Sequence, residues 1–239
     1  MKRVFPILAV LTAALLSYAL YEALIVAPTE QTMGDVQRIF YYHVPSAWTA
    51  FILFFINFVA SVVYLIRRSN KADMVALVTA EVGVVFCTVV LVTGPIWARP
   101  VWGIWWTWDL RLTLTLVLWL IYVSYLVLRR FSSSGQTPLL AAVLAIFGAL
   151  DVPLVYFSIW FFRTQHPQPV IGGGGSIDPR MLHVLLINWL AFSCFAALVC
   201  WSRYRLEVLR REMDETLALE ALLEPRGSQS RTSPTWRAG

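Results

Sequence analysis

The sequence predicts an all-α integral membrane protein with six transmembrane helices, both termini in the cytoplasm, and a tryptophan-rich outer segment between helices three and four. The prediction depends on the composition, the apolar runs and the distribution of positive charge. Of the 239 residues, 59% are hydrophobic and 14% are charged, whereas a soluble domain is about one quarter charged. This composition excludes an ordinary soluble enzyme, a disordered chain and a small disulfide scaffold.

Six apolar runs are long enough to cross a bilayer core, which takes roughly 20 helical residues. The expected spans are Val4–Val26, Ser46–Ile66, Met74–Thr93, Leu112–Leu128, Leu139–Phe162 and Leu182–Trp201. The first run follows two basic residues, as a signal peptide would. However, Glu22 interrupts it and no small-residue cleavage site ends it, so we expect a retained helix.

Positive charge sets the expected orientation. Fourteen of the 19 basic residues fall in segments that a cytoplasmic N-terminus would place inside. The other five belong to the outer segments: Arg38, Arg99, Arg111, Arg163 and Arg180. This bias predicts that both termini are cytoplasmic.

We expect residues 1–203 to form the membrane domain. Residues 204–239 should form a tail that begins as an amphipathic surface helix and ends disordered.

The outer segment Gly94–Arg111 holds five of the eleven tryptophans. They are Trp97, Trp102, Trp105, Trp106 and Trp108. If the chain is helical from Trp102, then Trp102, Trp105, Trp106 and Asp109 share one face. An interfacial aromatic belt is the alternative, but a belt usually takes about one or two tryptophans per helix end. The density favours an apolar platform, edged by a carboxylate, for a flat ligand.

All three histidines lie at expected outer helix ends. His43 precedes Pro45 and Ser46, which suit a helix start. His166 lies just beyond the fifth span and His183 at the start of the sixth. A lone interfacial histidine is more often a polar tip among lipid headgroups, but any two at similar depth could ligate a metal between them.

The platform, the imidazoles and the arginines together suggest haem. Imidazole is a common axial ligand of haem iron, and indoles suit the porphyrin face. Guanidinium groups pair with carboxylates such as the propionates. Arg38, Arg99 and Arg111 are the propionate candidates, although each could instead contact a lipid phosphate.

The segment from Trp102 to Thr113, Trp-Gly-Ile-Trp-Trp-Thr-Trp-Asp-Leu-Arg-Leu-Thr, resembles the "WWD" signature of haem-handling proteins of cytochrome c maturation. Among these proteins, the chain is most similar to the haem exporter protein C (CcmC) family. The length, the six spans, the orientation and the stretch Arg38–Pro45 agree with that family. The resemblance covers about Arg38 to Met181.

The resemblance implies a multi-pass protein of the inner membrane that is not an enzyme. It would bind b-type haem non-covalently and transiently at the periplasmic surface and deliver it to a periplasmic haem chaperone. It could also assist covalent attachment of haem to that chaperone. The implied partners are ATP-binding cassette transporter subunits, a small single-helix membrane protein and membrane lipid, with no nucleic acid.

The resemblance also implies roles for individual residues. His43, in its Tyr-x-His-Val-Pro setting, matches the first axial histidine. His166 matches the second, although Phe161-Phe162 replaces a tryptophan pair of the family pattern. His183 is the alternative second ligand.

The remaining implied haem contacts lie in two outer segments. Arg38 and Arg111 match family arginines that would contact the propionates. Asp109 matches the aspartate of the signature, and the five tryptophans match its aromatic platform.

Two other functions are possible from the sequence. A b-type electron-transfer cytochrome would place histidines in mid-span, where this chain has none. A transporter could couple through the intramembrane Glu81 and Asp151, but the sequence lacks repeat symmetry. We expect these two carboxyl groups to serve helix packing or subunit contact, because intramembrane charges normally have partners.

Overall fold

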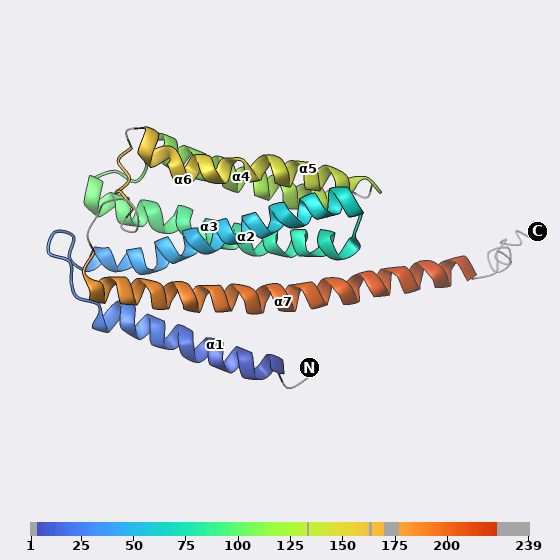
Figure 1. The fold of residues 1–239 in the computed structure, drawn as a ribbon, viewed down its shortest axis with the longest axis horizontal. Helices are drawn as coiled ribbons and strands as arrows, with labels where there is room; N and C mark the ends of the chain where they lie inside the picture. The colour runs from blue at the N-terminus through green and yellow to red at the C-terminus, as the bar shows by residue number, and fades with distance from the viewer. Residues whose placement is uncertain (1–3, 133, 163, 170–176, 224–239) are drawn as a thin grey trace, which may run out of the picture.

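The computed structural model describes residues 4–132, 134–162, 164–169 and 177–223, and the regular structure in these residues is helical (Figure 1). Its elements are α1 Val4–Tyr21, the π-helix η1 Glu22–Val26, the 3₁₀ helix η2 Asp35–Ile39, α2 Phe40–Arg67, α3 Asn70–Trp102, α4 Leu110–Phe131, α5 Thr137–Ala149, α6 Asp151–Phe161 and α7 Pro179–Leu223. Six helical segments of the described residues are long and apolar enough to cross a membrane, with α5 and α6 together forming the fifth. The predicted all-α, six-span fold is confirmed.

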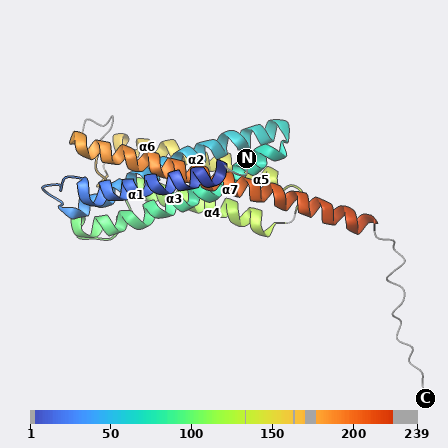
Figure 2. The same cartoon turned by 90° about the horizontal axis from the view of Figure 1, so that it is seen from below.

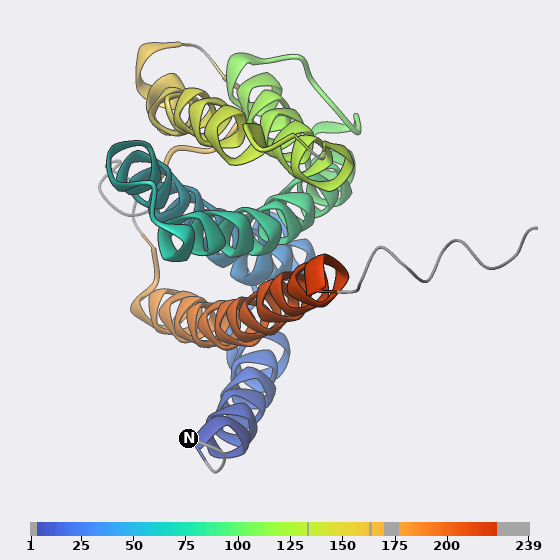
Figure 3. The same cartoon turned by 90° about the vertical axis from the view of Figure 1, so that its right-hand side faces the viewer.

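The helices run along one common axis and stack in layers. An end-on view shows α2 and α3 between the group α4–α6 and the long helix α7, with α1 on the far side of α7 (Figure 3). The described parts of the loops α1–α2, α3–α4 and α6–α7 lie at one end of the bundle (Figure 1). We call this the histidine end, because it carries His43 and His166, and we call the other the charged end.

The second and third spans are longer than predicted. The first span matches Val4–Val26, but α2 begins at Phe40 rather than at Ser46 and contains Pro45 within the helix. The predicted end of the third span at Thr93 is also wrong, since α3 continues through two prolines to Trp102. Proline is tolerated inside such helices because neighbouring groups satisfy the backbone carbonyl that it leaves free.

The fifth span is broken in the middle. α5 ends at Ala149 and α6 begins at Asp151, two residues before Pro153. Proline cannot donate the backbone hydrogen bond that would continue α5, so a kink at this position has a local cause. The side chain of Asp151 is buried at this break, and its Oδ2 has no hydrogen-bond partner among the described residues.

The sixth span and the first part of the expected tail form one helix. α7 has 45 residues, which at 1.5 Å per residue gives a length of about 68 Å, over twice the hydrocarbon thickness of about 30 Å. Its last turns project beyond the other helices (Figure 2). The helix therefore passes the expected domain boundary at residue 203 without a break. The tail residues 224–239, expected to be disordered, lie outside the described residues.

α2 and α3 form an antiparallel hairpin. Arg68 ends α2 in the left-handed region, and the Ser69 hydroxyl caps α3. In mid-membrane the Phe54 ring lies against Gly83, where a Cβ atom would come within 2.7 Å of the ring. Nearer the charged end, Asn57 Nδ2 donates to the carbonyl oxygen of Ala76 at 2.7 Å.

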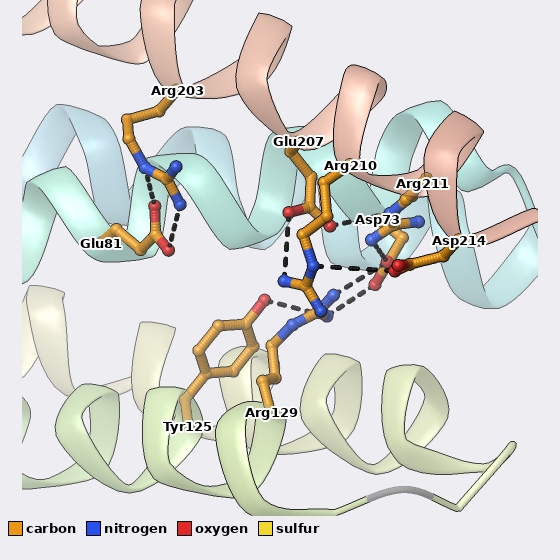
Figure 4. Close-up of polar contacts among 9 residues, drawn as sticks. All are labelled: Asp73, Glu81, Tyr125, Arg129, Arg203, Glu207, Arg210, Arg211 and Asp214. Carbon is orange, nitrogen blue, oxygen red and sulfur yellow. Dashed lines mark hydrogen bonds and ion pairs between the residues drawn. The ribbon is translucent and has the colours of Figure 1, made fainter. Parts of the chain in front are cut away.

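An ion-pair network ties α3, α4 and α7 together at the charged end (Figure 4). Asp73 on α3 is 2% exposed and accepts two hydrogen bonds from the Arg129 guanidinium of α4, at 2.6 and 2.8 Å. Arg211 of α7 donates to the same carboxylate at 2.7 Å and to Glu207 at 2.8 Å. Removing one partner from such a buried pair leaves an uncompensated charge.

The intramembrane Glu81 has its partner on α7. Its two carboxylate oxygens each accept a hydrogen bond from Arg203 at 2.9 Å (Figure 4). Arg203 was assigned to the cytoplasmic side from the sequence, and a long arginine side chain can extend along a helix to reach such a group. The contact supports a helix-packing role for Glu81.

Replacing Arg129 with leucine leaves Asp73 buried with one cation fewer. We expect the free energy of unfolding to fall by about 3–5 kcal/mol, measured as a lower thermal midpoint in detergent. Arg130→Leu is the matched control, because it removes the same charge from the neighbouring exposed position. Equal losses in both variants would contradict a structural role for the network.

Candidate functional site

The structure brings two of the three histidines together at the histidine end. His43 lies in the first turn of α2, and His166 lies in the segment that follows α6. Their ring centroids are 6.4 Å apart, and the ring planes differ by 33°. Both side chains are half-buried. This is the pair that the family resemblance implied as axial ligands.

The distance between the two ring centroids is close to the distance expected for two imidazoles bound to one iron atom. With a metal–imidazole bond of about 2.0 Å and a ring radius of about 1.1 Å, two axial imidazoles would have centroids about 6.2 Å apart. No group of three or more histidine, cysteine, aspartate or glutamate side chains able to hold a metal ion occurs among the described residues. Two imidazoles are sufficient protein ligands for a metal whose other ligands come from a macrocycle, as in haem.

The hydrogen bonds of the two rings identify which nitrogen is free. His43 Nδ1 lies 2.9 Å from Thr93 Oγ1, and that hydroxyl donates its proton to the Val89 carbonyl at 2.7 Å. Two oxygens at 2.7 Å repel unless a proton lies between them, so the Thr93 hydroxyl proton is assigned to this bond and Thr93 Oγ1 accepts from His43 Nδ1–H. His166 Nδ1 lies 2.9 Å from the Pro167 carbonyl, which can only accept. In the neutral rings, Nε2 of each histidine keeps its lone pair for a metal.

Arg111 lies beside this pair, in the first turn of α4. Burial and the positive charge of Arg111 lower the pKa of His166 to about 4. His166 is therefore neutral near pH 7, as a metal ligand must be. The Arg111 guanidinium is half-buried, and its hydrogen bonds within the described residues are long, at 3.4 and 3.5 Å, to the carbonyl oxygens of Val155 and Tyr156.

The tryptophan segment does not continue as a helix beyond Trp102, so the condition for one shared face of Trp102, Trp105, Trp106 and Asp109 is not met. α3 ends at Trp102, because Gly103 adopts a φ of +79° and its N–H bonds to the Arg99 carbonyl at 3.0 Å. The Arg99 guanidinium donates in turn to the Gly103 carbonyl. Left-handed backbone strongly favours glycine, so this residue sets the end of the helix.

The tryptophans are therefore divided between a helix end and a loop. Trp97 and Trp102 form an edge-to-face pair on α3, with centroids 5.2 Å apart. Trp106 and Trp108 form another on the loop, at 5.8 Å. Trp105 is 57% and Trp108 76% exposed. Large indole surfaces at this end remain open to a ligand or to the membrane interface.

Asp109 holds the loop against the start of α4. Its Oδ1 accepts from the backbone N–H of Leu112 at 3.0 Å, which makes it the N-cap of α4. Its Oδ2 accepts from the Thr107 hydroxyl at 3.2 Å. The sequence analysis missed this role, although an aspartate directly before an apolar helical run is a helix-start signal. By fixing the first turn of α4, Asp109 positions Arg111.

The structure gives Arg38 several protein partners. Its guanidinium donates to Asp35 at 3.0 Å, to the Ala23 carbonyl at 2.9 Å and to the Thr29 hydroxyl at 3.5 Å. All three partners lie in or near the connection between α1 and α2. Arg38 thus joins η1 to η2.

His183 lies in a different place from the histidine pair. It is exposed in the first turns of α7 and lines a cavity of about 280 Å³. The other lining residues come from η1 and α7: Glu22, Val26, Pro179, Arg180 and Val184. Neither His43 nor His166 borders this cavity.

Comparisons with known proteins find related sequences over most of the chain. A family model described as haem exporter protein C matches residues 1–219. The haem exporter protein C of Bradyrhizobium diazoefficiens is 35% identical over 222 residues, covering 92% of this chain and 84% of the relative. That of Escherichia coli K12 is 31% identical over 199 residues, covering 83% and 81%. A putative cytochrome c biosynthesis ccmC-like mitochondrial protein of Marchantia polymorpha is 31% identical over 179 residues, covering 74% and 76%.

Replacing Gly103 with alanine forces a side chain into left-handed backbone. A Cβ atom there meets nothing within 4 Å, so the cost is conformational alone, about 1 kcal/mol. We expect a lower thermal midpoint, with partial recovery in Gly103→Asn, since asparagine tolerates this region. Gly135→Ala is the control. A Cβ atom at Gly135 also meets nothing within 4 Å, but the φ of Gly135 is not positive. An unchanged midpoint in Gly103→Ala would contradict this account of the α3 terminus.

Proposed function

The chain belongs to the haem exporter protein C family, and from that premise we propose that it binds haem at the periplasmic membrane surface and delivers it to a periplasmic haem chaperone. The family implies haem handling in cytochrome c maturation and is a transport family rather than a known enzyme family. With its six apolar spans, the chain is a multi-pass inner-membrane protein.

The observation that carries the proposal is the histidine pair. His43 and His166 lie far apart in the sequence, yet their rings are separated by the distance that a bis-imidazole iron needs. Each ring has its Nδ1 engaged and its Nε2 available. Haem is the cargo here and supplies iron with two axial positions, which His43 and His166 would occupy.

Binding through two axial bonds and aromatic contacts involves no covalent attachment, and this suits transient holding. We propose that the exposed Trp105 and Trp108 pack on the porphyrin. Trp97, Trp102 and Trp106 would complete the apolar wall behind them. Offset stacking on indoles adds contact area without fixing the cargo permanently.

Arg111 is the proposed propionate contact. It lies beside the histidine pair, and its present contacts are long, so its donors can turn to a carboxylate without losing strong bonds. Three of the five N–H donors of Arg38 already have protein acceptors, which leaves two for a propionate. The Thr29 hydroxyl, at 3.5 Å, is the weakest of these acceptors.

The proposed orientation places the histidine end in the periplasm and the charged end in the cytoplasm. The distribution of fourteen basic residues against five supports this orientation. The histidine end would then face the chaperone. The proposed partners in the membrane are ATP-binding cassette transporter subunits and a small single-helix protein.

The ligand assignment is tested by replacing each histidine with alanine and titrating the purified protein with haem. We expect the wild type and His183→Ala to show a low-spin bis-imidazole spectrum. His43→Ala and His166→Ala should lose that spectrum, because each keeps a single axial ligand. Loss in His183→Ala with retention in His166→Ala would overturn the choice of second ligand.

The delivery step is tested by mixing haem-loaded protein with the purified periplasmic chaperone. We expect haem to move to the chaperone from the wild type, followed as loss of the bis-imidazole bands. A stable haem complex that never transfers would contradict delivery while leaving the binding site intact. Rapid redox cycling of the retained haem with a quinol would favour the electron-transfer alternative.

A further inference from the structure

Thr93, in an apolar stretch of α3, makes a hydrogen bond that the proposed haem chemistry depends on. We propose that Thr93 is a positioning residue that fixes the tautomer and orientation of His43 and increases electron donation from its Nε2 to the haem iron. The inference rests on the proposed function, because it requires His43 to be a haem ligand.

The direction of the bond follows from proton counting. Thr93 Oγ1 lies 2.7 Å from the Val89 carbonyl and 3.4 Å from the Val90 carbonyl, and neither oxygen can donate. Because two oxygens at 2.7 Å need a proton between them, the single hydroxyl proton is directed at the Val89 carbonyl. The Oγ1 lone pair that faces His43, at 2.9 Å, accepts the Nδ1 proton. His43 is then held with Nδ1 protonated and Nε2 bare.

The position of the acceptor is fixed by the helix. A threonine in a helix has few allowed χ1 angles, and its bond to the carbonyl one turn earlier selects one of them. The next residue, Gly94, also lies against the imidazole, since a Cβ atom there would be in ordinary van der Waals contact with His43 Cε1, at 3.5 Å. The contacts of Phe54 with Gly83 and of Asn57 with Ala76 fix the register of the two helices. The ring orientation is thus set by α3.

The chain of bonds from His43 through Thr93 to Val89 also polarises the ligand. A hydroxyl that donates to a carbonyl becomes a better acceptor, so it draws more strongly on the Nδ1 proton. A ligand histidine whose outer nitrogen donates in this way is a more basic ligand. A more basic imidazole stabilises ferric over ferrous iron. Loss of the Thr93 acceptor should therefore raise the reduction potential of the bound haem.

The two histidines are held by different means. His43 is fixed by a side chain of another membrane helix, whereas His166 bonds to the carbonyl of its own neighbour, Pro167. A change at Thr93 therefore acts on one axial ligand only. The expected spectroscopic change is an altered bis-imidazole complex and not the loss of both ligands.

The same helix offers a matched control at Thr88. Its hydroxyl donates to the Val84 carbonyl at 2.8 Å and accepts a ring N–H, from Trp119 Nε1, at 2.8 Å. Thr88→Val and Thr93→Val each remove one hydroxyl that donates one hydrogen bond to a backbone carbonyl and accepts another from a ring nitrogen. They differ in the ring that loses its acceptor, which is an indole in one case and the proposed iron ligand in the other.

The experiment compares full-length Thr93→Val, Thr93→Ser, Thr88→Val and wild type in detergent, titrated with haem. We expect Thr93→Val to lose about tenfold to a hundredfold in haem affinity. It should also shift the haem midpoint potential to more positive values and change the low-spin EPR g-values. Thr93→Ser retains the hydroxyl and should restore the wild-type potential and spectrum. Thr88→Val should match the wild type in haem affinity, in midpoint potential and in EPR g-values.

A measurement without haem keeps the inference testable if Thr93→Val folds poorly. The chain has only three histidines, so ¹⁵N-histidine NMR of the haem-free protein, assigned with the alanine variants, reports the tautomer of each. We expect Nδ1 of His43 to be protonated. An Nε2-protonated His43 would overturn the inference, as would equal affinity and potential in Thr93→Val and Thr88→Val.

Failure of the inference differs from failure of the proposed function. If His43→Ala binds haem with the wild-type spectrum, then His43 is not a ligand and the proposed function loses its site. If His43→Ala abolishes the spectrum while Thr93→Val equals the wild type, the ligand stands and only the role of Thr93 is refuted.

Discussion

The register between α2 and α3 is the constraint on which the proposed site depends. Helices in lipid gain little from apolar burial against each other, so close packing and hydrogen bonds decide how they align. Contacts at three depths serve this purpose: Asn57 with Ala76, Phe54 with Gly83, and His43 with Thr93. A slip of one turn would move His43 by about 5.4 Å. That shift would remove the Thr93 acceptor and the spacing to His166 together.

The two ends of the bundle are held in different ways. At the charged end, Asp73 joins three helices through short charged hydrogen bonds (Figure 4). At the histidine end, loops carry Trp105, Trp108 and His166, and single hydrogen bonds orient the rings. Bonds between buried charges resist separation, whereas exposed indoles and half-buried imidazoles can exchange a ligand. This division would suit the proposed uptake and release of haem by a bundle that stays intact.

The sequence predicted the residue types of the site better than their local structure. His43, His166 and Arg111 were named from their positions and from the family signature, and the structure places them together. The indole spacing would have given one face only in a helix that continued beyond Trp102, and Gly103 ends the helix there. Thr93 was not predicted at all. A threonine in an apolar span has no distinguishing local signal, and its importance arises only where α3 passes His43.

The sequence by itself determined the six spans and the family, because hydropathy and the tryptophan signature are properties of single segments. It did not determine where spans end, since α2, α3 and α7 continue past their apolar runs once neighbours and caps satisfy their backbones. Only the tertiary structure decided that His166 rather than His183 faces His43, and that Arg203 pairs with Glu81. These pairings depend on which helix faces lie against each other. That lateral packing comes from the whole set of contacts between segments and is not encoded in any one of them.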